Sequence, residues 1–393
     1  MRPARATLVI VIASAAGVVA ASLGGCAAQG TYTGELADEA ISRMDGLRSD
    51  TELDFARQAF EARRLDRAEQ RARSALAINP DSAGARLVLA RVAIERGRFA
   101  EAAAHAEASI ELGPGDAESH YVLGVALERR GVLEAARAAF SRAVELDPGD
   151  AHAALALAET LHMLGREREA EAMLLGWDGQ AYHAGAQQLL GQFAMARGDV
   201  STAIARLESA RTAAPADLGI IEDLAAAQLA AGRYAEAEAN LASLRASPGL
   251  GDRPDLVRQH AGCLRALGKL AEARDLYLSL AESAPSPERR ARLWSVVGEL
   301  SYRAGDQPVL RRAASRAVEA DPQRADGYVL WALWYLRDGE PGRVRESIEA
   351  GLARASDPAD LELLSRALEG LGGGEGVGES APGGALAGVE TDG

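Results

Sequence analysis

The chain has 393 residues, of which 48% are hydrophobic but only 4% aromatic, and its formal net charge is −14. Its apolar surface is therefore mostly alanine and leucine, which form helices readily and let them pack closely. The acidic balance argues against a nucleic-acid ligand, because such a ligand requires a basic face that neutralises phosphates.

The first 25 residues have the layout of a secretory signal peptide, in which Arg2 and Arg5 precede an apolar run over residues 6–23. The run ends at Leu23 and is followed by Gly24, Gly25 and Cys26. These four residues resemble a bacterial lipobox, in which small residues let a signal peptidase reach the backbone and a cysteine becomes the lipidated first residue of the mature chain.

The resemblance implies a lipid anchor at Cys26 and an exported chain. Ala27 follows the cysteine in place of an aspartate, and by resemblance to proteobacterial lipoproteins this favours the outer membrane, with the chain facing the periplasm. Two alternatives remain open. The apolar run is barely long enough to be an uncleaved transmembrane anchor, and a plain cleaved signal would make Cys26 accidental.

The segments on either side of the central region differ from it in composition. Residues 26–48 are expected to be a tether between the membrane and the folded region. Residues 372–393 contain glycine clusters and scattered acidic residues, so they carry too little apolar surface to fold and are expected to be disordered.

Between these segments, glycine recurs at intervals of 33 to 37 residues. A step of about 34 residues is typical of a helix-turn-helix repeat that must stack on copies of itself to bury its apolar face. A solenoid of such repeats has no upper limit on length, because each unit contacts only its neighbours. The recurring glycines are Gly97, Gly131, Gly165, Gly198, Gly232, Gly268, Gly305 and Gly339.

The clearest copy spans residues 117–150. Small residues, Gly124 and Ala136, stand where two antiparallel helices would cross, and Gly131 stands where the first helix must stop. Pro148 ends the second helix, and Asp150 is placed to cap the next one. The apolar stripe consists of Leu123, Leu127, Phe140 and Ala143, and Tyr121 and Leu146 fall in order along the same unit. With these residues in this order, the unit resembles a tetratricopeptide repeat.

The resemblance implies an all-α, right-handed α-solenoid of about nine units with a C-terminal capping helix at residues 358–371. Alanine recurs in the helix-crossing position, at Ala68, Ala102, Ala136, Ala170, Ala203, Ala237 and Ala273. The first unit has Arg63 in place of glycine, and the fourth has Tyr182 in place of proline. Residues 252–253 and 288–290 are expected to lengthen two connections. The predicted units are 49–82, 83–116, 117–150, 151–183, 184–217, 218–251, 254–287, 291–324 and 325–357.

Catalytic and metal-binding patterns are weak in this sequence. Neither a zinc-protease motif nor a nucleophile elbow occurs, and His152 and His162 lie about 15 Å apart on one helix, too far to share a metal. Cys263 is expected to be a buried small hydrophobe. An aromatic cluster, Tyr328, Trp331, Trp334 and Tyr335, is expected to be core rather than a ligand-stacking site. We therefore expect no enzymatic activity, no cofactor and no metal.

The resemblance places a concave groove on the first helix of each unit, at its second, fifth, ninth, twelfth and thirteenth positions. In the first four units these positions hold Asp50, Arg57, Glu61, Leu87, Arg91, Glu95, Glu118, Tyr121, Glu128, Arg129, His152, Glu159, His162 and Met163. In the last three units they hold Asp255, Arg258, Arg265, Arg292, Glu299, Tyr302, Arg303, Asp326, Val329, Leu333 and Arg337.

This groove is predicted to be acidic near the tether and mildly basic far from it. A partner segment is expected to dock with its acidic end toward Arg265, Arg292 and Arg303, since complementary charge fixes register. The alternative is that these side chains are only a solvated face. The expected function is a lipid-anchored scaffold that binds protein segments and helps assemble or stabilise an envelope complex. Alternatives are an accessory lipoprotein of pilus or secretin biogenesis or polysaccharide export, or a glycan-handling enzyme subunit.

Overall fold

The computed structural model describes residues 30–366 apart from positions 114, 358, 360–361 and 364. These residues form 18 α-helices and one short 3-10 helix, η1 (Gln180–Tyr182), and they contain no strand. The segments predicted as a signal peptide and as a lipobox with Cys26, and the glycine-rich tail, lie outside the described residues. Among the described helices, none combines the length and the apolar character that crossing a membrane would require.

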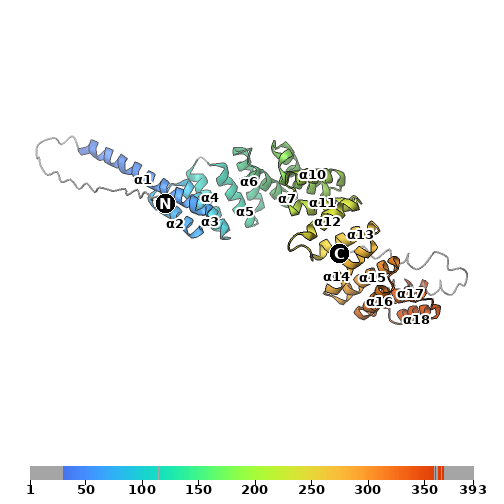
Figure 1. Ribbon diagram of the computed structural model, residues 1–393. Coiled ribbons are helices and arrows are strands. Elements are labelled where there is room, and N and C mark those ends of the chain that lie inside the picture. The colour runs from blue at the N-terminus through green and yellow to red at the C-terminus, as the bar shows by residue number, and fades with distance from the viewer. Residues whose placement is uncertain (1–29, 114, 358, 360–361, 364, 367–393) are drawn as a thin grey trace, which may run out of the picture. The chain divides into compact units, whose positions relative to one another are not determined.

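The helices alternate along the chain as the first and the second member of a repeat, and we call the odd-numbered ones A helices and the even-numbered ones B helices (Figure 1). The A helices are α1 (Gly30–Glu61), α3 (Ala83–Glu95), α5 (Ala117–Arg129), α7 (Ala151–Met163), α9 (Ala184–Ala196), α11 (Leu218–Ala230), α13 (Pro254–Ala266), α15 (Pro287–Ala304) and α17 (Asp326–Asp338). The B helices are α2 (Leu65–Ile78), α4 (Phe99–Leu112), α6 (Leu133–Leu146), α8 (Glu167–Gly176), α10 (Val200–Ala213), α12 (Tyr234–Ala246), α14 (Leu270–Ser283), α16 (Gln307–Ala320) and α18 (Pro341–Leu352).

The chain divides into two compact bodies between Val132 and Leu133. In the first body, α1 to α5, the core consists of small clusters of alanine, leucine and valine between consecutive helices. In the second body, α6 to α18, two such clusters lie between α9 and α13, and a larger one extends over α13 to α18. Each helix therefore buries its apolar stripe against its immediate neighbours, as stacked repeats do.

The seven alanines in the helix-crossing position have no exposed surface. A methyl group is the largest side chain that leaves room for two helix backbones to approach closely, so this position explains the recurrence of alanine along the sequence.

The recurring glycines end the A helices in the left-handed conformation. All eight have φ between 70° and 79°, a region where a Cβ atom is strained. Arg63, which replaces glycine in the first unit, adopts the same conformation with φ 57°, and it is the single non-glycine residue with positive φ in the described part of the chain. The bends predicted from the glycine spacing are confirmed.

Aspartate caps several A helices. Asp150 accepts a hydrogen bond from the backbone N–H of His152 at 2.9 Å, which confirms its predicted role. Asp116 and Asp217 do the same for α5 and α11. Each carboxylate satisfies an N–H that has no partner within its helix.

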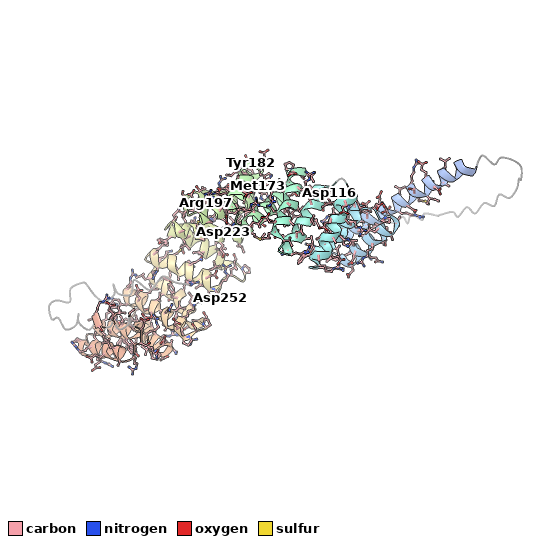
Figure 2. The ribbon with its side chains drawn as sticks, turned by 180° about the vertical axis from the view of Figure 1, so that it is seen from behind. Asp116, Met173, Tyr182, Arg197, Asp223 and Asp252 are labelled. Carbon is pink, nitrogen blue, oxygen red and sulfur yellow. The ribbon has the colours of Figure 1, made fainter. Side chains whose placement is uncertain are left out.

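The fourth unit departs most from the pattern. Its B helix, α8, has 10 residues and is followed by η1. The indole N–H of Trp177, the residue directly after α8, donates to the backbone oxygen of Pro148 at 3.0 Å. Tyr182, which occupies the proline position, is 89% exposed and points outward in Figure 2.

One of the two predicted insertions differs from the prediction. Residues 288–290 were expected to lie in a loop, but α15 begins at Pro287, so they form its first turn. Proline is favourable there because the first helical N–H needs no partner, and Ser286 caps the helix by accepting from the N–H of Arg289 at 3.2 Å. The segment predicted as a tether is helical from Gly30 and continuous with the first A helix. Of the predicted capping helix, Leu363 packs against the core of the second body.

Candidate protein-binding surface

The candidate site is the polar face of the A helices. Every residue of the predicted groove lies on an A helix, and most of the polar ones are exposed or half-buried. Because the chain forms two bodies, the surface is described separately in each.

In the first body, Arg91 connects three A helices. It projects from α3, donates to the Glu118 carboxylate of α5 at 2.8 Å, and stacks over the Phe60 ring of α1 with its guanidinium carbon 4.4 Å from the ring centroid. Tyr121 on α5 is half-buried against the apolar cluster that includes Leu87 and Val122. Arg91 thus joins side chains of α1, α3 and α5. On the last turns of α5, Glu128 is half-buried and Arg129 is exposed.

In the second body, the surface begins with the histidines and the carboxylate of α7. His152 and His162 are exposed. The His162 ring lies 5.4 Å from the Phe193 ring of α9, and its Nδ1 lies 3.8 Å from a Glu167 carboxylate oxygen. Glu159 lies on the exposed face of α7, where partial desolvation by the surrounding protein raises the pKa of its carboxyl group.

The middle of the second body carries a polar network that the sequence analysis missed. Gln188 and Gln192 on α9 both donate through their side-chain amides to one oxygen of Asp223 on α11, each at 2.7 Å (Asp223 is labelled in Figure 2). Beside it, Glu222 on α11 pairs with Arg253 at the start of α13. Side chains of α9 and α11 are therefore joined directly, and Arg253, the residue before α13, adds a contact from the next connection.

The sequence analysis applied the five groove positions only to the first four and the last three units. Applied to the middle units as well, these positions would have identified part of this network. Gln188, Gln192 and Glu222 occupy the fifth or ninth position of their helices, both of which are groove positions. Asp223 occupies the sixth position, which is not one of them. Its role follows only from the amide contacts.

Three exposed arginines of the last two units already have partners in their own body. Arg292 pairs with Glu288 at 2.6 Å and Arg303 with Glu299 at 3.6 Å, both four residues apart on α15. Arg337 on α17 lies over the Tyr302 ring, 4.7 Å from its centroid. On α13, Arg258 is exposed and Arg265 half-buried. Exposed pairs at this spacing stabilise a helix by only about 0.3–0.5 kcal/mol, so an incoming carboxylate can replace them.

Four residues assigned to the groove are buried instead. Leu87 is 7% exposed, Val329 3% and Leu333 1%, because their apolar side chains belong to the cores of their bodies. Asp326 is 4% exposed, and its carboxylate accepts from Arg324 at 2.6 Å. For the three apolar residues, the groove positions of the family gave a wrong prediction because an apolar side chain in such a position packs into the core instead of facing the groove.

Other candidate sites have structural roles. Cys263 is fully buried, and burial raises the pKa of its thiol to about 11, which disfavours the reactive thiolate. Tyr328 is buried, while Trp331, Trp334 and Tyr335 are half-buried against the main core of the second body. Within the described residues, no cluster of histidine, cysteine and carboxylate side chains could hold a metal ion.

A polar hollow of about 640 Å³ lies over α2 in the first body, away from the groove positions. Its charged residues neutralise one another, since Glu69 pairs with Arg73 at 2.5 Å and also with Arg96. The hollow therefore presents little net charge to a ligand.

Comparison with known proteins agrees with this architecture. Two family models described as tetratricopeptide repeat match residues 53–117, 90–151, 127–193 and 194–250, which together span about half of the chain. A search of curated proteins gave no significant match.

Several solved structures are similar. YrrB, a TPR protein with an unusual peptide-binding site, is 21% identical and is matched over 50% of this chain and 98% of its own, with a TM-score of 0.40. The Pseudomonas aeruginosa protein PilF is 22% identical over 54% of this chain and 94% of its own, with a TM-score of 0.39. PilW, a type IV pilus biogenesis factor, is 17% identical over 62% and 96%, with a TM-score of 0.40. On the evidence of its repeats, its helix pairs and the matching family models, the chain belongs to the tetratricopeptide repeat family.

Proposed function

We propose that this chain is a non-enzymatic scaffold that binds segments of partner proteins along the polar face of its A helices. Tetratricopeptide repeat proteins generally mediate protein–protein interactions. The observation that supports a binding role most directly is the network of Gln188, Gln192 and Asp223. Carboxamides can donate to and accept from an extended backbone, and a network across neighbouring helices holds them in position before the partner arrives.

We further propose that the scaffold is exported and held at a bacterial membrane by a lipid on Cys26, with the outer membrane favoured and the repeats facing the periplasm. This proposal rests on the signal-peptide layout and the four-residue lipobox. In that position the scaffold would help assemble or stabilise a complex of the cell envelope.

The test is affinity capture from solubilised envelopes with the native protein, a Cys26→Ser variant and an Arg303→Glu variant. Cys26→Ser is expected to move the protein from the membrane to the soluble fraction, and unchanged fractionation would contradict the lipid anchor. The identity of captured proteins then distinguishes a general envelope complex from pilus, secretin or glycan-export machinery.

Arg303→Glu tests the charge of the surface. It places a carboxylate where an acidic partner segment is expected, so capture should fall about tenfold, equivalent to about 1.4 kcal/mol. The control is Arg316→Glu on the B helix α16, because Arg316 is 56% exposed and pairs with Glu319, as Arg303 is 51% exposed and pairs with Glu299. If capture of the partner falls equally in both variants, the net charge of the protein, rather than the A-helix face, governs binding.

A further inference from the structure

The first A helix extends beyond its B-helix partner. α1 has 32 residues, whereas α3 and α5 have 13 each. The last turn of α2 reaches Ser49, whose hydroxyl donates to the backbone oxygen of Ala75 at 3.2 Å. The turns of α1 before Ser49 therefore project past α2, as Figure 1 shows.

This projecting helix carries an exposed apolar stripe. Leu36 is 53% exposed, Ile41 53%, Met44 48% and Leu47 69%. At 100° per residue they lie within an arc of about 140°, the width of an apolar stripe that normally faces a partner. Phe55, 46% exposed and covered in part by Arg71 of α2, ends the stripe in the part of α1 that runs alongside α2.

The stripe lies on a different face from the buried one. Ser49, Leu53 and Ala56, which contact the rest of the first body, project from the other side of the helix. The stripe is therefore not a continuation of the repeat core, and stacking of the repeats does not account for it.

The polar residues along the stripe are mainly acidic. Between residues 36 and 54 there are six carboxylates and two arginines. Both arginines are paired within the helix, Arg43 with Glu39 at 2.5 Å and Arg48 with Asp45 at 3.4 Å. Two more carboxylates have arginine partners, since Glu52 pairs with Arg71 of α2 at 2.9 Å and Asp54 with Arg57 at 3.8 Å. The six carboxylates therefore stand against four arginines. The apolar stripe is thus bordered by net negative charge.

We propose that this segment of α1 binds an amphipathic helix of a partner protein whose apolar stripe is bordered by lysine and arginine. Such a helix would cover the four apolar side chains and place cations beside the carboxylates, as charged flanks do in paired helices. A membrane surface fits less well, because helices that lie on membranes carry lysine and arginine on their polar face. A second copy of the chain would bring like charges together. The four apolar residues of this site precede Asp50, the first residue of the proposed groove.

The test uses the full-length protein and two labelled synthetic helical peptides with the same leucine stripe, one bordered by lysine and the other by glutamate. Fluorescence anisotropy should show that the lysine peptide binds at least about tenfold more tightly than the glutamate peptide, with binding weakened by salt. A Met44→Ser, Leu47→Ser variant should lose at least about tenfold in affinity for the lysine peptide.

The control is Leu175→Ser, which removes a leucine that is 46% exposed on α8 in the other body and should leave binding unchanged. Circular dichroism checks that each variant keeps its helices. Equal binding of the two peptides, or of the double variant and the native protein, would overturn the proposal. Two other outcomes would also overturn the proposal. If the native protein self-associates and the double variant does not, the stripe binds a second copy of the chain. If the native protein floats with phosphatidylcholine–phosphatidylglycerol vesicles and the double variant does not, the stripe binds a lipid surface.

Discussion

Replacing Phe193 by alanine is expected to lower the free energy of unfolding of the second body by about 3–5 kcal/mol. Phe193 is 1% exposed in the middle of α9, where it is among the largest fully buried side chains. Removing the ring loses the favourable free energy of transferring it from water to the core. It also leaves a cavity, so the surrounding atoms lose their contacts with the ring. Because a repeat array gains stability from interfaces between neighbours, the loss should spread beyond α9.

The measurement is urea unfolding followed by circular dichroism, with Tyr182→Ala as the control. Tyr182 is an aromatic residue in the adjacent connection but is 89% exposed, so its replacement should change the free energy by no more than about 0.5 kcal/mol. If both variants lose the same stability, α9 does not form the buried core described for it.

Two glycine-to-alanine substitutions are expected to have opposite signs. At Gly327, an added methyl group would lie 2.6 Å from a side-chain carbon of Val318 and 2.9 Å from its backbone nitrogen. A backbone atom cannot move aside, so Gly327→Ala should destabilise the protein by about 1–3 kcal/mol. At Gly262, within α13, nothing lies within 4 Å of the added methyl. Gly262→Ala should stabilise the protein by about 0.5–1 kcal/mol through helix propensity.

Thermal unfolding of the two variants beside the native protein tests this prediction. The midpoint should fall for Gly327→Ala and rise for Gly262→Ala. A rise in both would mean that α16 and α17 do not approach as closely at Gly327 as the structure shows, since helix propensity would then decide both outcomes.

The sequence predicted the bends and the helix crossings well because each depends on a local steric requirement. Only glycine enters the left-handed conformation without strain, so the spacing of glycines located the ends of the A helices. Ala68 and its counterparts were identified by the same reasoning, because a small side chain is needed wherever two helices cross.

Features that depend on neighbours could not be predicted from local patterns. Whether residues 288–290 form a loop or a helical turn is decided by Pro287 and the Ser286 cap, which a repeat frame does not consider. Val329 was placed in the groove by position, but its apolar side chain packs into the core. The Gln188 and Asp223 contact joins residues 35 positions apart, and neither residue alone indicates it. The exposed stripe of α1 required knowing where α2 ends.

The claim that the A-helix face binds partner proteins is tested most directly by site-specific photo-crosslinking in intact cells. A photoreactive amino acid is placed at Gln192 on α9, which is exposed on the candidate surface, and at Glu208 on the B helix α10, which is also exposed. We predict a discrete crosslinked partner from position 192 and none from position 208. Crosslinks from position 208 alone, or the same products from both, would contradict the account.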